Sequence, residues 1–387
     1  MLITATAWPQ ASSREVIGNG ATATKAVAWV YVSSSPQGSN TNQVVGYSAA
    51  ANGSLTPLPG SPFPVNVYSM AVNGKYLMAS SLEAPNVNAY DIASDGSLIF
   101  AAATNYAQYN APPPGCGSAG NLFFDHTGAS LYIQEFNGSD ACSNTVVASF
   151  NVVKATGALQ YLGTAVTGVF PGFNAAASFI GNNTYAYGAV DSACMYYSVY
   201  GFRRDPKGML NEFNPTWNSP TPPDGVRAYI PALAAADPTN HVAFTLQPAN
   251  PPGCASNPLQ LASYTVDANG NLTTTNTFAN MPATLVANPY DLKMSPSGKQ
   301  LAVAGQEGLQ VFHFRGALPI KGYTGLLTTD PISQMFWDNR HHLYAISHSA
   351  GKLYVFTITA TTYAMAPGSP YALSAPNSVI VQPLPRY

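Results

Sequence analysis

The chain has little charge of either sign. Aspartate, glutamate, lysine and arginine make up 8% of its 387 residues, whereas soluble domains usually contain about 25%. The formal net charge is −2 and no basic run occurs, so nothing attracts a phosphate backbone and no nucleic-acid partner is expected. Polarity comes instead from Ser, Thr, Asn, Gln and Tyr. Such a surface favours an extracellular or periplasmic location over a crowded cytosol.

Long apolar segments are missing too. No apolar run of about 18 residues occurs, so no membrane span is expected. Residues 1–25 lack the basic start and apolar middle of a secretory signal; a removed leader, a misplaced start codon or an intracellular protein would each explain this. We interpret 1–25 as an N-terminal extension and 26–387 as one domain. No phosphate-binding glycine loop, zinc-binding helix motif or Gly-x-Ser-x-Gly elbow is present, so no cofactor or metal is expected.

The sequence does contain one turn written six times, each copy with leucine two residues after its glycine. Asn-Gly and Asp-Gly supply the positive φ angles that tight hairpins need, and a period of roughly 40 to 60 residues is typical of propellers and repeat arrays. The copies are Asn52-Gly53-Ser54-Leu55, Asp95-Gly96-Ser97-Leu98, Thr156-Gly157-Ala158-Leu159, Lys207-Gly208-Met209-Leu210, Asn269-Gly270-Asn271-Leu272 and Arg315-Gly316-Ala317-Leu318.

A four-strand unit surrounds each of the six turns, and a seventh unit contains a degenerate version of the turn, so seven units can be counted. Each has a small apolar strand, a turn, a strand rich in Tyr and β-branched residues, and then a strand with a central aromatic residue. The seven aromatic residues are Tyr47, Tyr90, Phe150, Phe202, Tyr264, Phe312 and Phe356. The pattern predicts an all-β fold, a seven-bladed β-propeller of four-stranded antiparallel blades.

The two ends of the chain are predicted to close the ring. Pro59-Gly60-Ser61-Pro62-Phe63 recurs as Pro367-Gly368-Ser369-Pro370-Tyr371, just before a last strand at residues 378–381. Residues 27–32 begin a unit without an innermost strand, so the C-terminal strand is expected to complete the first blade. Closure would remove the exposed sheet edges that invite aggregation.

Strand direction places the four cysteines on one face, the face on which the inner strands start. An even number of cysteines in an exterior protein favours two disulfides, and four cysteines allow three pairings. We favour Cys116 with Cys142, which share a blade, and Cys194 with Cys254 on adjacent blades. Free thiols and a zinc site are the alternatives, although the closely spaced cysteine pairs of zinc sites are absent.

With these features the chain resembles the lactonase-type seven-bladed propellers, which include bacterial 6-phosphogluconolactonase and the fungal carboxymuconate-cyclising enzyme. The resemblance extends over residues 26–383, through the Pro-Gly-Ser-Pro links, the Asp-Gly-Ser-Leu turn and the turn Ser295-Pro296-Ser297-Gly298-Lys299. It implies a propeller fold and, if the site were intact, lactone hydrolysis.

The catalytic motifs that the resemblance implies are altered. The bacterial enzymes open their third blade with a Gly-Cys-His-Ser-Ala-Asn type segment, and here Gly117 takes the histidine position between Cys116 and Ser118. They also place arginine after proline at the start of several inner strands, where it would hold an anionic substrate. The corresponding pairs here are Pro231-Ala232, Pro289-Tyr290 and Pro331-Ile332. A phosphorylated sugar lactone is therefore not the expected substrate.

A polar, weakly charged collar remains at the axial mouth. Hydroxyls and amides beside aromatic rings suit a neutral, carbohydrate-like ligand, but small polar residues also fit any inner strand around a water-filled axis. The collar residues are Asn66, Ser69, Ser118, Asn121, Tyr229, Asn288, Asp291, Asp330, Ser333 and Asn377.

Charged residues near the mouth offer the minimum set for opening a lactone. Glu135 or Asp291 would act as the general base and Arg227 would stabilise an oxyanion. His348, Asp191 and Glu307 lie near the same face, and each of these residues alone is more often a solvated rim residue.

Two interpretations of function follow. The first is a non-catalytic exterior propeller that binds a small neutral ligand or assembles with other subunits or with itself. The second is a lactone hydrolase with an altered site. Fold does not decide between them, since propellers host both kinds of work.

Overall fold

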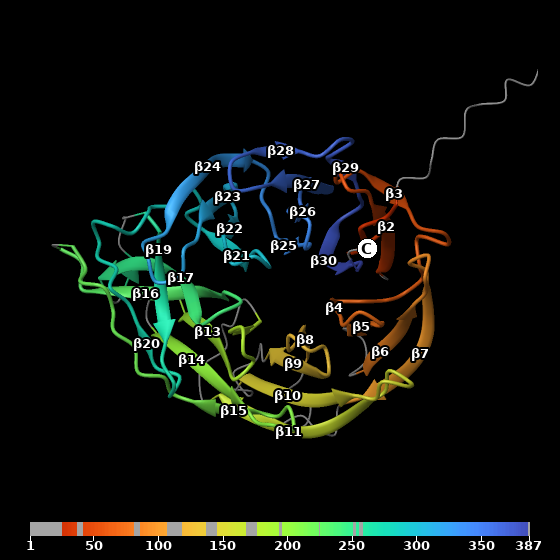
Figure 1. The fold of residues 1–387 in the computed structure, drawn as a ribbon, viewed down its shortest axis with the longest axis horizontal. Coiled ribbons are helices and arrows are strands. Elements are labelled where there is room, and N and C mark those ends of the chain that lie inside the picture. The colour runs from red at the N-terminus through yellow and green to blue at the C-terminus, as the bar shows by residue number, and fades with distance from the viewer. Residues whose placement is uncertain are drawn as a thin grey trace, which may run out of the picture.

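The structure is a computed structural model, and the part of the chain that it describes is a ring of β-sheets (Figure 1). Among these residues there are seven antiparallel sheets built on four strands each, two of which carry an extra short strand. The predicted seven-bladed β-propeller is therefore confirmed. No described segment forms a helix long and apolar enough to cross a membrane. The described residues are 25–36, 42–80, 86–106, 118–136, 145–167, 176–192, 196–223, 225–250, 253–254 and 258–385.

The blades are numbered in chain order, and their strands run from the axis outwards. Blade 1 contains β30 (Pro376–Pro383), β1 (Ala28–Ser34), β2 (Gln43–Ala49) and β3 (Leu55–Pro57). Blade 2 contains β4 (Ser69–Val72), β5 (Tyr76–Ser80), β6 (Asn86–Ile92) and β7 (Leu98–Asn105). Blade 3 contains β8 (Ser118–Phe124), β9 (Ser130–Phe136), β10 (Thr145–Val152) and β11 (Leu159–Thr167). Blade 4 contains β12 (Ser178–Phe179), β13 (Tyr185–Ser192), β14 (Tyr196–Arg204) and β15 (Leu210–Phe213).

The last three blades follow the same order. Blade 5 contains β16 (Ala228–Ala236), β17 (His241–Asn250), β19 (Gln260–Val266) and β20 (Leu272–Thr273), with β18 (Gly253–Cys254) paired to β17. Blade 6 contains β21 (Pro289–Met294), β22 (Gln300–Gly305), β23 (Gly308–His313) and β24 (Lys321–Thr328). Blade 7 contains β25 (Gln334–Trp337), β26 (His342–Ser347), β27 (Lys352–Ile358) and β28 (Tyr363–Met365), with β29 (Tyr371–Ala372) paired to β27.

The C-terminal strand closes the ring as predicted. β30 pairs with β1 from Ala28 opposite Pro383 to Ser34 opposite Pro376, and Figure 1 shows the blue C-terminal strand beside the red N-terminal blade. Pairing of β30 with β1 leaves neither strand with an exposed edge at this position, and blade 1 is therefore built from both ends of the chain.

The apolar core lies between neighbouring blades. The second strands β5, β22 and β26 are buried at every residue, because a blade in the ring has a neighbour on both faces and its central strands cannot alternate between core and solvent. A typical cluster joins Met78 of blade 2 to Leu131 and Phe150 of blade 3. Each blade therefore depends on its neighbours for burial, as in other repeat proteins.

The repeated turn also joins one blade to the next. All six of its glycines have positive φ, between 62° and 102°, which confirms the expected backbone conformation. Tyrosine hydroxyls on second strands donate to the turn glycine carbonyl of the following blade. Tyr31 donates to Gly96 O at 2.7 Å, Tyr132 to Gly208 O at 2.8 Å and Tyr187 to Gly270 O at 2.7 Å.

Antiparallel order gives the ring two distinct faces. The inner strands start on one face, which we call the upper face, together with the loops between second and third strands. The turns between first and second strands and the glycine turns lie on the opposite face, the lower face.

Candidate functional site

Inner-strand polar side chains hold neighbouring blades together around the axis. Ser69 Oγ on β4 accepts the backbone N–H of Leu122 on β8 at 3.0 Å. Strands of different blades have no shared ladder, so such side chains satisfy backbone donors that would otherwise be unpaired. Ser178 and Gln334 accept the N–H groups of Ala236 and Val379 in the same way. Part of the predicted collar therefore has a structural role.

Asp291, a predicted general base, has such contacts on both oxygens. Its Oδ2 accepts the N–H of Met335 in blade 7 at 2.8 Å, and its Oδ1 accepts the N–H of Leu292 at 3.0 Å and lies 3.2 Å from Lys293 Nζ. The residue is only 4% exposed. A general base must reach the proton that it removes, and these contacts turn the carboxylate towards the joint between blades 6 and 7.

A second group on the upper face of blade 6 surrounds Glu307. This carboxylate accepts the N–H groups of Ala287 and Asn288 at 2.9 and 3.1 Å and the Asn288 Nδ2 at 2.7 Å. Burial acts to raise the pKa of Glu307, but these hydrogen bonds outweigh it and hold the pKa below its usual range. Beside them the exposed Tyr290 donates its hydroxyl to Gln306 Oε1 at 2.6 Å. The group presents an amide and an aromatic ring rather than a free base.

Asp330 lies in the link between blades 6 and 7 and is paired. Lys352 Nζ donates to its Oδ2 at 2.8 Å, and the Tyr354 hydroxyl donates to the same oxygen. The hydrogen bond from Lys352, followed by that from Tyr354, lowers the pKa of Asp330, and the same contact raises the pKa of Lys352. Sequence reasoning missed both partners, although Lys352 and Tyr354 are two residues apart on β27 and therefore share one face.

Asn66, Asn377 and His348 lie near the upper ends of blades 2, 1 and 7, respectively. Asn66 Oδ1 accepts the N–H of Asn42 at 3.3 Å, and Asn377 Nδ2 donates to Ser35 Oγ at 3.1 Å. The exposed His348 has its Nδ1 3.3 Å from the carbonyl oxygen of Pro376. The structure thus brings amides and one imidazole together with the Asp330 link around three consecutive blades.

Other predicted site residues lie elsewhere or are only partly described. Tyr229 is 1% exposed and donates its hydroxyl to Gln260 Oε1 at 2.9 Å, and burial raises its pKa to about 12. Its side chain belongs to the core of blade 5. Arg227 is exposed, and its backbone N–H donates to Ala249 O at 3.0 Å. Asn121 is half-buried opposite Gln134 on β9.

The remaining predictions stay untested. Ser118 on β8 and Glu135 on β9 are described by backbone only, with Ser118 opposite Phe136 and Glu135 opposite Val146. Cys254 is part of β18, whereas Cys116, Cys142 and Cys194 lie outside the described residues. The two proposed disulfides therefore remain predictions.

Solved structures with this architecture include lactonase-like propellers. A candidate 6-phosphogluconolactonase from Bacteroides fragilis is 14% identical, with a TM-score of 0.60, covering 93% of this chain and 99% of its own. A candidate 6-phosphogluconolactonase from Bacteroides uniformis is 14% identical, with a TM-score of 0.61, covering 92% and 99%. A Lactobacillus plantarum protein is 12% identical, with a TM-score of 0.63, also covering 92% and 99%.

Sequence comparison adds nothing to this likeness. No family model matches the chain, and no curated protein matches it either. Identities of 12 to 14% show shared architecture and not shared chemistry. The chain has the fold of the 6-phosphogluconolactonase-like seven-bladed β-propellers.

Proposed function

We propose that the protein is a non-catalytic exterior propeller that binds a small neutral, hydroxylated ligand on the upper face of blades 6 and 7. The observation that carries the proposal is the bonding of the carboxylates on that face. Asp291, Glu307 and Asp330 each accept hydrogen bonds from backbone or side-chain donors. These hydrogen bonds hold neighbouring loops and strands in place, which is a structural role for the three carboxylates.

The electrostatics of this face also favour binding over hydrolysis. A general base works best when its pKa lies near the working pH, and the pKa values of Glu307 and Asp330 are lowered below their usual range. Amides and an exposed aromatic ring are suited instead to sugar hydroxyls and apolar sugar faces. Asn288, Gln306 and the 43% exposed Tyr290 provide them.

The altered family positions agree with this proposal. Where the resemblance implies an arginine after Pro331, Ile332 is fully buried between blades 6 and 7. After Pro289, the corresponding position holds Tyr290 with its exposed ring. Neither side chain can form the paired hydrogen bonds with a phosphate that arginine makes.

The proposal is tested by binding neutral oligosaccharides. The protein would be screened on an array of neutral glycans, and the best binder would be titrated by calorimetry. We expect Asn288→Ala and Tyr290→Ala each to weaken binding by about tenfold, since they remove a hydrogen-bonding amide and a stacking surface. Tyr363→Ala is the matched control, because its ring is 48% exposed on the outer strand β28. Equal losses in all three variants, or no bound neutral glycan, would contradict the proposal.

Lactone hydrolysis is the alternative that a second assay separates. Proton release would be followed on a pH-stat with neutral and phosphorylated sugar lactones, comparing the wild type with Glu135→Gln and Asp291→Asn. Turnover that either substitution abolishes without loss of folding would replace the binding proposal by an altered lactonase.

Assembly is the other form of the binding proposal. With 8% charged residues, a self-associating surface would form oligomers that are insensitive to salt, because few charges are available for screening. Light scattering at high protein concentration over a range of salt would show this, and a monomer throughout would exclude self-assembly.

A further inference from the structure

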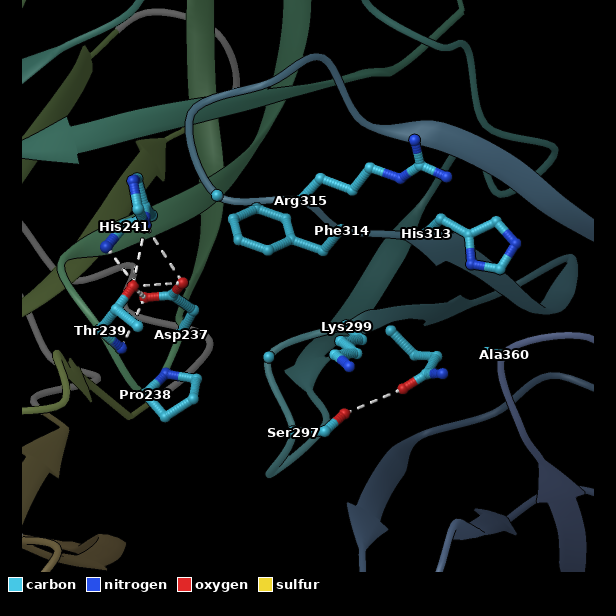
Figure 2. Close-up of a pocket in the computed structure, with 13 residues that line it drawn as sticks. Asp237, Pro238, Thr239, His241, Ser297, Lys299, His313, Phe314, Arg315 and Ala360 are labelled. Atoms are coloured by element: carbon cyan, nitrogen blue, oxygen red, sulfur yellow. Dashed lines mark hydrogen bonds and ion pairs between the residues drawn. The ribbon is translucent and has the colours of Figure 1, made fainter.

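A hollow opens on the lower face between blades 5 and 6, far along the strands from the upper-face groups. Its volume is about 530 Å³. It is formed by the turn at 237–240 after β16, the turn at 295–299 after β21 and the segment 314–316 after β23 (Figure 2). Ala360, in the turn that follows β27 of blade 7, borders it on the right of the view.

A shortened glycine turn accounts for the space. In blade 6, four residues separate the central aromatic Phe312 from the turn glycine Gly316. In the other five glycine turns this separation is six or seven residues, as for Phe202 and Gly208 in blade 4. The shorter connection of blade 6 provides fewer atoms to fill the joint on its lower side.

Two cations border the hollow without an acidic partner. Lys299 and Arg315 are both exposed, and among the described residues neither takes part in an ion pair. Figure 2 shows Lys299 below the hollow and Arg315 above it, with His313 beside Arg315. Exposed Thr239 and Ser297 add hydroxyl groups to the lining.

The carboxylate in the lining, Asp237, forms no ion pair with either cation. Both oxygens of Asp237 accept the Thr239 hydroxyl at 2.7 Å, and Oδ2 lies 3.1 Å from His241 Nδ1. Its Oδ1 also accepts the N–H groups of Thr239 and His241 at 2.9 Å. Asp237 therefore folds its own turn, at the left of Figure 2, away from Lys299 and Arg315.

The joint between blades 3 and 4 shows what a paired version looks like. There Asp125, in the turn that corresponds to that of Asp237, binds Arg204 NH2 of blade 4 at 2.8 Å. Arg204 follows the central aromatic Phe202 by two residues. The same position in blade 6 is Phe314, which is 2% exposed. Blade 6 thus has an apolar ring in place of the pairing arginine, and its cations stand at the rim of the hollow instead.

We propose that this hollow binds a small organic phosphate or sulfate. Lysine and arginine side chains from two different segments would contact the anionic oxygens, with arginine able to donate two parallel hydrogen bonds. The hydroxyls of Thr239 and Ser297 would bind polar atoms of the organic part, and Pro238 offers it an apolar wall. The site is independent of the neutral-ligand face, which lies at the other end of the strands.

The surroundings of His313 give the site a spectroscopic reporter. Its imidazole packs against the Tyr323 ring, tilted by 32° and with ring centroids 4.1 Å apart, and burial followed by the charge of Arg315 lowers its pKa. An anion bound between Lys299 and Arg315 would offset that positive charge, so the pKa of His313 should rise on binding.

The test is calorimetric titration of the full-length protein at low ionic strength with inorganic phosphate, sulfate, glucose 6-phosphate and glucose. We expect saturable binding of glucose 6-phosphate at least about tenfold tighter than glucose, and a loss of about tenfold or more in Lys299→Ala and Arg315→Gln. Lys207→Ala is the matched control, because Lys207 precedes the turn glycine of blade 4 as Arg315 precedes that of blade 6. Circular dichroism confirms that each variant is folded.

Three results of the titration would overturn the proposal. They are equal binding of glucose and glucose 6-phosphate, no saturation by any phosphate or sulfate, and equal loss of affinity in Lys207→Ala. Vesicles containing phosphatidylglycerol separate a lipid headgroup from a free ligand, and binding to vesicles alone would contradict the small-ligand assignment. Proton NMR of His313 supplies the second readout, with a higher pKa expected in the presence of glucose 6-phosphate and also in Arg315→Gln without ligand.

Discussion

The closure joint between blades 7 and 1 should depend on one buried carboxylate, Asp338. This residue is 1% exposed and accepts four hydrogen bonds. Its donors are Arg340 N at 2.7 Å, His342 N at 2.9 Å, His342 Nδ1 at 2.7 Å and the Tyr344 hydroxyl at 3.2 Å. His342 is fully buried, so Asp338→Ala would leave buried donors without an acceptor.

The cost follows from what is left unpaired. Breaking a buried pair by removing one member costs about 3–5 kcal/mol. Unfolding entropy of about 2.1 cal/mol/K per residue gives a chain of 387 residues roughly 0.8 kcal/mol/K. A loss of ~4 kcal/mol therefore lowers Tm by about 5 °C.

The substitution should also weaken the packing of blade 7 against blade 1, where the propeller closes. A side-chain carbon placed on Gly53, in the glycine turn of blade 1, would lie 3.1 Å from His342 Cδ2. His342 is thus in close contact with blade 1. Without its hydrogen bond to Asp338, the His342 imidazole would shift and disturb that contact. We expect the variant to remain a propeller with reduced stability.

Thermal unfolding followed by circular dichroism measures the effect. Asp95→Ala is the control, since Asp95 also accepts from its own turn, at 3.0 Å from Ser97 N and 2.7 Å from Ser97 Oγ, but is exposed. Its substitution should change Tm far less. If Asp338→Ala melts within about 1 °C of the wild type, the reasoning from burial is wrong, because hydrogen bonds to a buried carboxylate would then be as weak as those to an exposed one.

Three further predictions concern stability and covalent structure. Asp291→Ala should cost about 1.5–3 kcal/mol in urea unfolding and Asp291→Asn less, because the amide oxygen can still accept the N–H of Met335; equal losses would argue against this bond. Burial raises the pKa of Tyr132 from 10.0 to about 12, so its stabilising effect is complete below pH 10 and is lost as pH rises towards 12; Tyr132→Phe should flatten this alkaline loss, and identical pH curves would count against it. Titration of the denatured protein without reductant should find no reactive thiols if both disulfides form, whereas four would refute them.

The architecture could be predicted because its signals are local. Each glycine turn carries its own backbone requirement, as the φ of 85° at Gly96 shows, and the seven strands with a central aromatic residue give the number of blades. The links between blades could not be predicted. Tyr31 and Gly96 are 65 residues apart, and nothing near Tyr31 in sequence distinguishes a hydroxyl that donates to another blade from one that faces solvent.

For the candidate site, the sequence indicated only the face on which the residues lie. Strand direction placed Asp291 and Asp330 on the upper face, but it could not predict their bonding across blades, because Met335 is on β25 and the two partners of Asp330 are on β27. Tyr229 shows the same limit, since alternation along β16 assigns it to one of two faces without saying which face is closed by the next blade. Its hydroxyl meets Gln260, 31 residues away.

The low charge of the chain determines how its two candidate sites differ. At the upper face of blades 6 and 7, Lys352 lies beside Asp330, and Lys293, further along β21, lies beside Asp291. A ligand on this face therefore meets little net charge. On a surface of ordinary composition, carboxylates within a Debye length of about 10 Å would also weaken the field of Lys299 and Arg315. With charged residues at 8% of the chain, few can do so. The same scarcity of charge that favours a neutral ligand above therefore favours an anionic ligand below.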